Sequence, residues 1–204
     1  MARYTGPKVK VARRLGLALT DKQLRIMTKR NFPPGVHGPV NGHPRLSEFG
    51  RQLKEKQKAK FIYGILERQL RNYVKEATKK TGNSSSLIFS LLEQRMDNAV
   101  YRAGFAETRP KARQLVNHGH FLLNGKKVDV PSIQVKVGDI IEVKERSKKS
   151  PVFSKVAERA KELQQSSWIN PDADNLKFKI IDLPKVADMT GEFDPKMIIE
   201  FYSK

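Results

Sequence analysis

The spacing of apolar residues along the chain changes from three or four residues to two. From Ile62 to Ala77 apolar side chains recur at three- and four-residue spacing, which is typical of one face of an amphipathic helix. Ser47 is a suitable N-cap and Gly82 a suitable stop. We therefore expect one charged helix from Glu48 to that glycine. Its opposite face is basic and meets either solvent or phosphate, through Lys60, Arg68, Arg71, Lys75 and Lys79.

Two more helices are expected before the spacing changes. A short linker at residues 84–86 precedes a helix from Leu87 to Arg102. Thr108 caps the next helix, Pro110 lies in its first turn, where the missing N–H is not needed, and Gly119 ends it. The apolar face of this helix is formed by Ala112, Leu115 and Val116, and the adjacent face stacks Arg109, Arg113 and Asn117 at four-residue spacing.

Residues 121–143 alternate apolar and polar positions, as strands do. Asn124-Gly125 lies between two such runs, and these residues accept the positive φ angles of a type I′ hairpin turn. Further strands are expected at 133–137, 140–143 and 176–181. Residues 152–165 and 195–202 read as helices, the latter with Met197, Ile198 and Phe201 inward. Residues 92–143 are therefore expected to form two helices followed by a small twisted sheet.

The first 45 residues are rich in Gly and Pro, which predicts mostly loop with at most one short helix near Asp21 to Lys29. Charge is also concentrated at this end. Residues 1–60 carry 15 basic and 3 acidic side chains, residues 61–150 carry 17 and 9, and residues 151–204 carry 8 and 9. This asymmetry favours an arm that lies along phosphates over a solvated tail. A mitochondrial transit peptide would also be basic, but Pro33 to Pro39 interrupts any amphipathic helix.

The composition of the 204 residues points to a polyanionic partner, because the net charge is +19 and the isoelectric point about 10.2. The absence of cysteine excludes a disulfide scaffold, thiol catalysis and cysteine-ligated zinc. No run of about 18 apolar residues could span a bilayer, and the opening residues lack an apolar signal core. We expect a soluble cytosolic protein with no membrane partner.

Catalytic and metal chemistry have little support in the sequence. His118 and His120 could be metal ligands, but Gly119 between them already ends a helix and no second pair stands at ligand spacing. Paired carboxylates, a serine nucleophile elbow and a phosphate-binding glycine loop are not found. We therefore predict no enzyme activity, no metal and no cofactor.

Nucleic-acid binding has better support, in the region from Arg109 to Lys127. A helix with Arg109 and Arg113 leads into a hairpin with Lys126 and Lys127 at its turn, so cations on adjacent elements could cradle a phosphate backbone. Asn117, His118 and Asn124 could hydrogen-bond ribose or base edges. The alternative is an ordinary charged surface around a small domain.

A family resemblance rests on the run from Leu92 to Phe105, together with Thr108, residues 112–116, 118–120 and 123–125. These residues resemble the small RNA-binding module named after small-subunit ribosomal protein four. The resemblance extends to the family's bacterial members over the rest of the chain, through residues 1–7, 34–38, 52–58, 63–69 and 199–204.

The resemblance implies an α+β fold in which the RNA-binding module is inserted into a helical domain. The implied boundaries are a basic arm at 1–46, a helical domain at 47–90 completed by 185–204, and the module with its C-terminal extension at 91–184. It also implies that the last helix packs on residues 48–80. The implied function is that of a structural constituent of the small ribosomal subunit in the cytoplasm. Such a protein is a primary binder of the small-subunit ribosomal RNA (rRNA) and nucleates assembly around a multi-helix junction. A role in translational accuracy is implied as well.

The predicted partners are small-subunit rRNA, neighbouring small-subunit proteins, and messenger RNA (mRNA) at the tunnel through which it enters the subunit. The predicted RNA-binding residues are Arg3, Arg13, Arg14, Lys29, Arg30, His37, Arg45, Arg51, Lys54, Lys58, Arg68, Arg71, Arg95, Arg109, Arg113, Asn117, His118, His120, Asn124, Lys126 and Lys127.

Two departures from the family pattern matter. Many relatives bind zinc through four N-terminal cysteines, which this chain lacks, so it resembles the zinc-free form. Relatives also carry several basic residues before Arg45, where this chain has Asn41-Gly42-His43, which weakens the case for unwinding mRNA. An RNA-modifying enzyme carrying the same module is the alternative from another class, but no remaining stretch is long enough for a catalytic domain. A translational repressor of its own messenger is compatible with the main reading.

Overall fold

The computed structural model describes residues 4–41, 45–154, 156, 158–159, 166–185, 188 and 193–203. The chain divides into two compact units, the first formed by residues 1–85 with 190–204 and the second by residues 86–189. Each unit has its own hydrophobic interior.

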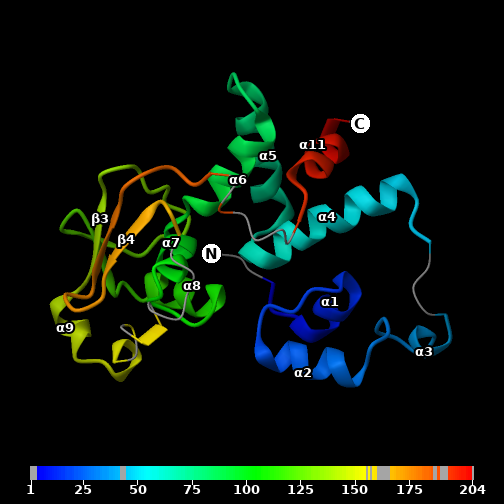
Figure 1. The fold of residues 1–204 in the computed structure, drawn as a ribbon, viewed down its shortest axis with the longest axis horizontal. Helices are drawn as coiled ribbons and strands as arrows, with labels where there is room; N and C mark the ends of the chain where they lie inside the picture. Colours follow the sequence, from blue (N-terminus) through cyan, green and yellow to red (C-terminus); the bar gives the residue numbers. More distant parts are fainter. Residues whose placement is uncertain are drawn as a thin grey trace. The chain divides into compact units, whose positions relative to one another are not determined.

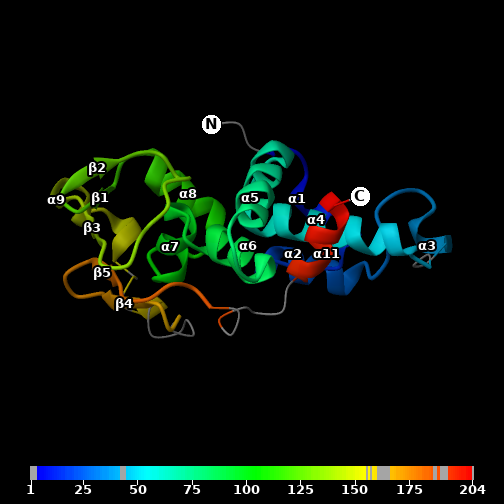
Figure 2. The same ribbon diagram turned by 90° about the horizontal axis from the view of Figure 1, so that it is seen from above.

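The first unit is helical (Figure 1). Its helices are α1 (Lys8–Leu15), α2 (Asp21–Lys29), α3 (Gly38–Asn41), α4 (Glu48–Tyr63), α5 (Glu67–Lys79) and α11 (Pro195–Ser203). The C-terminal helix α11 packs on α4 and α5, and both ribbon views draw it beside α4 (Figures 1 and 2). Residues far apart in the sequence therefore share one interior, which includes Ile62, Leu70, Val74 and Ile198.

The N-terminal segment is more helical than predicted. The short helix at Asp21 to Lys29 is confirmed, with Thr20 as its N-cap, but α1 and α3 were not expected. The breakers that suggested loop lie instead at helix ends, where they are tolerated. Pro7 precedes α1, and Gly16 ends it in the left-handed conformation at φ 72°.

The single helix expected from Glu48 to Gly82 is two helices. Ser47 caps α4 as predicted, its hydroxyl accepting a hydrogen bond from the Gly50 N–H. The helix then stops at Gly64, whose φ of 60° is the left-handed conformation that ends α4 before α5 begins. The apolar stripe continued across this break because both helices turn their apolar sides toward the same interior.

The second unit contains α6 (Ser84–Glu93, its first two residues in the first unit), α7 (Met96–Arg102), α8 (Arg109–Asn117), the short α9 (Glu145–Lys148) and a 3₁₀ turn at Pro151–Phe153. Its strands are β1 (Phe121–Leu123), β2 (Lys126–Val128), β3 (Ile140–Val143), β4 (Ile169–Asp172) and β5 (Lys177–Ile180). They form one antiparallel sheet in the order β2-β1-β3-β5-β4.

The sheet packs its inner face against α7 and α8, which lie together on one side of it in both views (Figures 1 and 2). Phe121, Ile141 and Phe178 from the strands meet Val100 and Val116 from the helices in this core. The predictions of the hairpin, of strands at 140–143 and 176–181, and of an α+β fold are confirmed. The strand β4 and the helix α9 were missed.

The helix expected from Leu87 to Arg102 is interrupted. Residues 84–86 are the first turn of α6, not a linker, and α6 ends at Glu93. The backbone then pairs with residues 133–135, since Met96 N–H donates to the Ile133 carbonyl at 2.8 Å and Val135 N–H to the Gln94 carbonyl at 2.9 Å. Residues 133–137, expected to be a strand, thus brace this break rather than joining the sheet.

The two C-terminal helices predicted from sequence differ in outcome. The helix at 195–202 is confirmed as α11, with Ile198 buried. Of the helix expected at 152–165, the structure describes a 3₁₀ turn at its start, and residues 155, 157 and 160–165 lie outside the described part.

Candidate nucleic-acid interface

Two buried carboxylates organise the polar side chains of the second unit. Glu93 ends α6 and Asp97 lies in the first turn of α7, and both are almost inaccessible to solvent. Arg102 binds Glu93 through two contacts of 2.8 and 3.1 Å, the bidentate geometry that makes guanidinium–carboxylate pairs strong. Asn98 donates to the same carboxylate at 2.9 Å.

Asp97 is held by arginines from two elements. Arg95, with 0% exposure, donates through Nε at 3.0 Å and through an Nη at 2.7 Å. Arg113 from α8 lies 3.6 Å from the same carboxylate. Charges removed from water are tolerated only when they are paired in this way, so the cluster ties α7 to α8.

The prediction that Arg109 and Arg113 share an exposed basic face is wrong. Arg113 is 6% exposed, and the Nε of Arg109 donates to the Asn98 side-chain oxygen at 2.8 Å while its guanidinium stacks 4.7 Å from the centre of the Tyr101 ring. The helix faces were assigned from spacing, which places the two arginines correctly on one side of α8. There they meet Glu93 at the end of α6 and Asp97 of α7.

The exposed cations of the second unit lie around the hairpin. Lys126 and Lys127 are exposed on β2, and Asn117 and His118 are exposed at the end of α8. A Cβ placed on Gly119 would come within 2.6 Å of the Lys127 side chain, so this lysine crosses the turn between α8 and β1. This close approach brings the hairpin beside the end of α8, whereas the two arginines predicted to share a phosphate cradle with these lysines contact Glu93 and Asp97.

His120 connects this surface to the segment after β3. Its Nδ1 lies 2.9 Å from the Ser147 hydroxyl, and its carbonyl accepts from the Lys144 N–H at 2.9 Å. Burial lowers the pKa of His120, and the nearby His118 lowers it further. At neutral pH the imidazole is therefore neutral and acts through hydrogen bonds rather than charge.

Three further exposed cations, Lys144, Arg146 and Lys149, lie on this segment and were not among the predicted site residues. The basic run from residue 144 was visible in the sequence. What the sequence could not supply was its contact with His120, because the two are 24 residues apart. We name the surface formed by His118, Lys126, Lys127, Lys144 and Arg146 the hairpin surface.

Asn124 has a structural role in the hairpin turn. Its side-chain oxygen accepts from the Ile140 N–H and its side-chain nitrogen donates to Asp139, both at 2.9 Å. Its φ of 49° and that of Gly125 at 77° fit the predicted turn. The amide expected to read a base edge is thus occupied in joining the turn to β3.

In the first unit, helix α5 presents a row of exposed cations along its outer side. We call Arg68, Arg71, Lys75 and Lys79 the α5 stripe. On α4, Arg51 is exposed beside Glu48, Lys54 is half-buried, and Lys58 is bound to Glu55 at 2.7 Å. Arg45 is exposed ahead of α4.

The basic residues of the N-terminal segment fall into two groups. Arg14, Lys29, Arg30 and His37 are exposed. Arg13 instead donates to the Phe32 carbonyl at 2.8 Å and stacks on the Phe32 ring, so it holds α1 to the segment after α2. Arg3 lies outside the described residues.

A polar network attaches the C-terminal helix to α4 and α5. Lys56 and Lys60 contact the two oxygens of Glu67 at 3.0 and 2.8 Å, and the Tyr202 hydroxyl donates to Glu67 at 2.5 Å. Burial raises the pKa of Glu67, but the hydrogen bonds from Lys60, Tyr202 and Lys56 outweigh it and bring the pKa to about 2. Burial and the bond to Glu67 raise the pKa of Tyr202.

Two family models match the chain. The model described as the ribosomal protein S4/S9 N-terminal domain matches residues 3–93, and the S4 domain model matches residues 94–141. Small ribosomal subunit protein uS4 of Sulfurihydrogenibium sp. is 47% identical over 204 residues, and its counterpart in Chloroflexus aurantiacus is 45% identical over 206 residues. The uS4 protein of Pelodictyon phaeoclathratiforme is 45% identical over 204 residues. Each alignment covers the full length of both proteins.

The chain belongs to the uS4 family of small ribosomal subunit proteins. This confirms the resemblance stated from sequence. Members of the uS4 family are ribosomal proteins and the family is not known to be enzymatic, which confirms the prediction that the chain is not an enzyme. The second unit contains the S4 domain, so the buried carboxylate network and the hairpin surface are both features of that domain or its immediate extension.

The described residues contain no group of three or more metal-ligating side chains suitably placed for an ion. They also contain no helix of the length and apolar character needed to cross a bilayer.

Proposed function

We propose that the protein is a structural constituent of the small ribosomal subunit in the cytoplasm and binds small-subunit rRNA through exposed cations of both units. The observation that supports this proposal is the hairpin surface, where Lys127 crosses the turn before β1 and the segment carrying Lys144 and Arg146 contacts His120. Clustered cations on a rigid scaffold bind phosphates and release their counterions.

The proposal extends to assembly. Residues 91–184 act as the inserted RNA-binding module, residues 1–46 as a basic arm, and residues 47–90 with 185–204 as the helical domain. Because the α5 stripe and the hairpin surface belong to different units, one protein can bind two separate segments of rRNA. A protein that binds two segments of a multi-helix junction stabilises their arrangement, which is how we propose that it nucleates assembly and influences translational accuracy.

Exposed Arg45 supports the proposal of a contact with mRNA where it enters the subunit. The residues immediately before it, 42–44, lie outside the described part. Repression of the protein's own messenger would use the same cations, provided that the messenger presents a similar RNA fold.

Chemical footprinting of the full-length protein on its own small-subunit rRNA tests the proposal. We expect protection at a multi-helix junction, without added metal. Affinity should fall with salt by about 0.7 to 0.9 in the logarithmic slope for each phosphate contacted. A slope near zero, or protection no different from that given by an unrelated basic protein, would contradict rRNA binding.

A further inference from the structure

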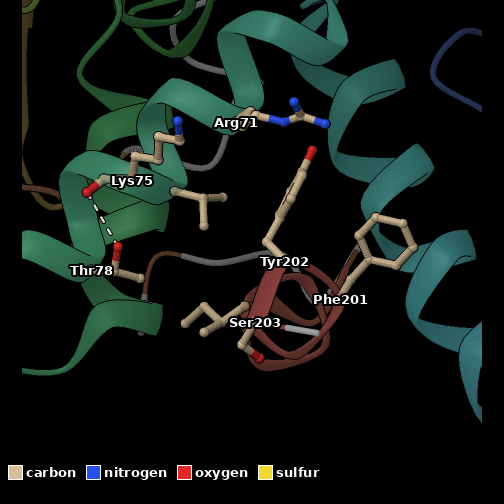
Figure 3. A pocket seen from close by; sticks show the side chains of 8 residues that line it. Arg71, Lys75, Thr78, Phe201, Tyr202 and Ser203 are labelled. Carbon is tan, nitrogen blue, oxygen red and sulfur yellow. Dashed lines mark hydrogen bonds between the residues drawn. The ribbon is translucent and has the colours of Figure 1, made fainter.

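A pocket of about 580 Å³ lies between α5 and α11 of the first unit (Figure 3). Its volume falls within the range of about 300 to 1,000 Å³ typical of small-molecule sites. The lining residues come from the two helices only: Arg71, Val74, Lys75, Thr78, Ile199, Phe201, Tyr202 and Ser203.

The pocket combines an apolar wall with cations. Val74 is buried and Tyr202 half-buried, and they contribute apolar and ring surface. The Phe201 ring instead packs on Phe49 and Lys56 of α4. Arg71 and Lys75, one helical turn apart, are exposed. Figure 3 shows the Arg71 guanidinium and the Tyr202 hydroxyl pointing toward one another. The lining residues include two cations and no carboxylate.

Hydrogen-bonding capacity remains at the pocket. The Thr78 hydroxyl donates to the Lys75 carbonyl at 3.2 Å and the Ser203 hydroxyl to the Glu200 carbonyl at 3.0 Å. Each hydroxyl oxygen retains lone pairs that can accept from a ligand N–H. The pocket therefore suits a ligand with a flat apolar face, polar N–H groups and a negative charge.

The cations of the pocket belong to a longer row. Arg71 and Lys75 are the middle members of the α5 stripe, with Arg68 before them and Lys79 after them, all exposed. Spacings of three and four residues place the four cations along one side of the helix. An RNA backbone that follows this row passes the mouth of the pocket.

We propose that the pocket takes an unstacked nucleotide of the RNA strand whose phosphates follow the α5 stripe. The base lies against the Tyr202 ring, and the adjoining phosphate binds Arg71 and Lys75. Proteins that bind single-stranded RNA stack bases on aromatic side chains beside a cationic track, and this pocket supplies both elements. The inference rests on the proposed rRNA binding and adds a specific subsite to it.

The test is ultraviolet crosslinking of the full-length protein bound to its small-subunit rRNA, with RNA adducts located by mass spectrometry. We expect adducts on Tyr202. The Thr78→Trp variant keeps the charge but fills the pocket, so these adducts should disappear and affinity for the rRNA should fall about ten-fold, the effect of losing one base stack. Thr81→Trp is the matched control, because Thr81 is exposed just after α5 and belongs to neither the pocket lining nor the α5 stripe. It should keep both adducts and affinity.

Removing one charge provides a second comparison. Arg71→Gln should reduce the adducts in the pocket, whereas Arg68→Gln removes the same charge from the stripe and should leave them. Tight rRNA binding without adducts on residues 199–203, or equal behaviour of the two tryptophan variants, would overturn the proposal. So would crosslinking of the pocket to a ribosomal protein rather than to RNA in the assembled subunit. If the unmodified protein does not bind the rRNA at all, the proposed function itself is overturned.

Discussion

Arginine has different surroundings in the two units. In the second unit, Arg95 and Arg113 lie almost fully buried around the carboxylate of Asp97. In the first, Arg68 and Arg71 stand exposed on the outside of α5. In the sequence all four look alike, as basic residues in or beside a helical stretch. The surroundings decide which arginines fold the protein and which are available to a phosphate.

The difference has a physical origin in the carboxylates nearby. A buried carboxylate must be paired, and Asp97 and Glu93 recruit their partners from α7 and α8. In the first unit Glu67 is bound by the lysines of α4 and by Tyr202, so the α5 stripe is not needed for its pairing. Where other side chains neutralise a nearby carboxylate, the arginines and lysines around it remain available to bind RNA phosphates.

Breaking the Asp97 cluster should have the largest effect on stability. Asp97→Asn preserves shape but leaves Arg95 and Arg113 without their shared counter-charge, so we expect the free energy of unfolding to fall by about 3 to 5 kcal/mol. Urea unfolding followed by the fluorescence of Trp168, which is fully buried in the same unit, measures this. The exposed Asp174→Asn change is the control and should cost about 0.5 kcal/mol or less.

Arg113→Gln tests whether the buried arginine stabilises the fold. Arg95 remains on Asp97 in this variant, so we expect a smaller loss of about 1 to 3 kcal/mol in the same unfolding experiment. The face assigned from sequence alone implied almost no loss. An unfolding midpoint equal to that of the parent would show that the ion pair does not contribute and would restore that earlier assignment.

Sequence alone predicted the local features of the module better than its long-range pairing. The Thr108 cap, the Asn124-Gly125 turn and the inward face of α8 follow from rules that involve neighbouring residues. The break at Gln94 and Arg95 depends on pairing with residues 133–135, about 40 positions away. The same holds for Arg113, whose role depends on a carboxylate 16 residues earlier. Periodicity identifies which residues share a face but not what that face meets.

The attachment of the C-terminal helix should weaken in acid. The folded-state pKa of Glu67 is about 2, below its ordinary value of 4.5. The ionised carboxylate therefore contributes stability above about pH 5, and this contribution is lost as the pH falls toward 2. Because the side chain is 37% exposed, solvent screening limits the effect to about 1 to 2 kcal/mol.

Comparison of the parent with Glu67→Gln isolates that contribution. The difference in unfolding free energy between them, followed by far-ultraviolet circular dichroism, should be largest near neutral pH and should shrink in acid. The Glu76→Gln variant, which removes an exposed carboxylate paired with Lys80 on α5, serves as the control. A parent-minus-variant difference that stays constant with pH would assign the effect to packing rather than charge.

The smallest effect on stability is expected at the hairpin surface, where the consequence should appear in binding instead. Lys126 and Lys127 are exposed, so replacing both by Gln should change the unfolding free energy by about 0.5 kcal/mol or less per site. If both lysines contact phosphates, the slope of log affinity for rRNA against log salt should decrease by about 0.7 to 0.9 for each. Arg113→Gln should show the reverse, with stability lost and the salt slope of the folded protein unchanged. Should the lysine variant instead unfold early, or bind rRNA with the parent's salt slope, exposure alone would not distinguish RNA-binding cations from structural ones.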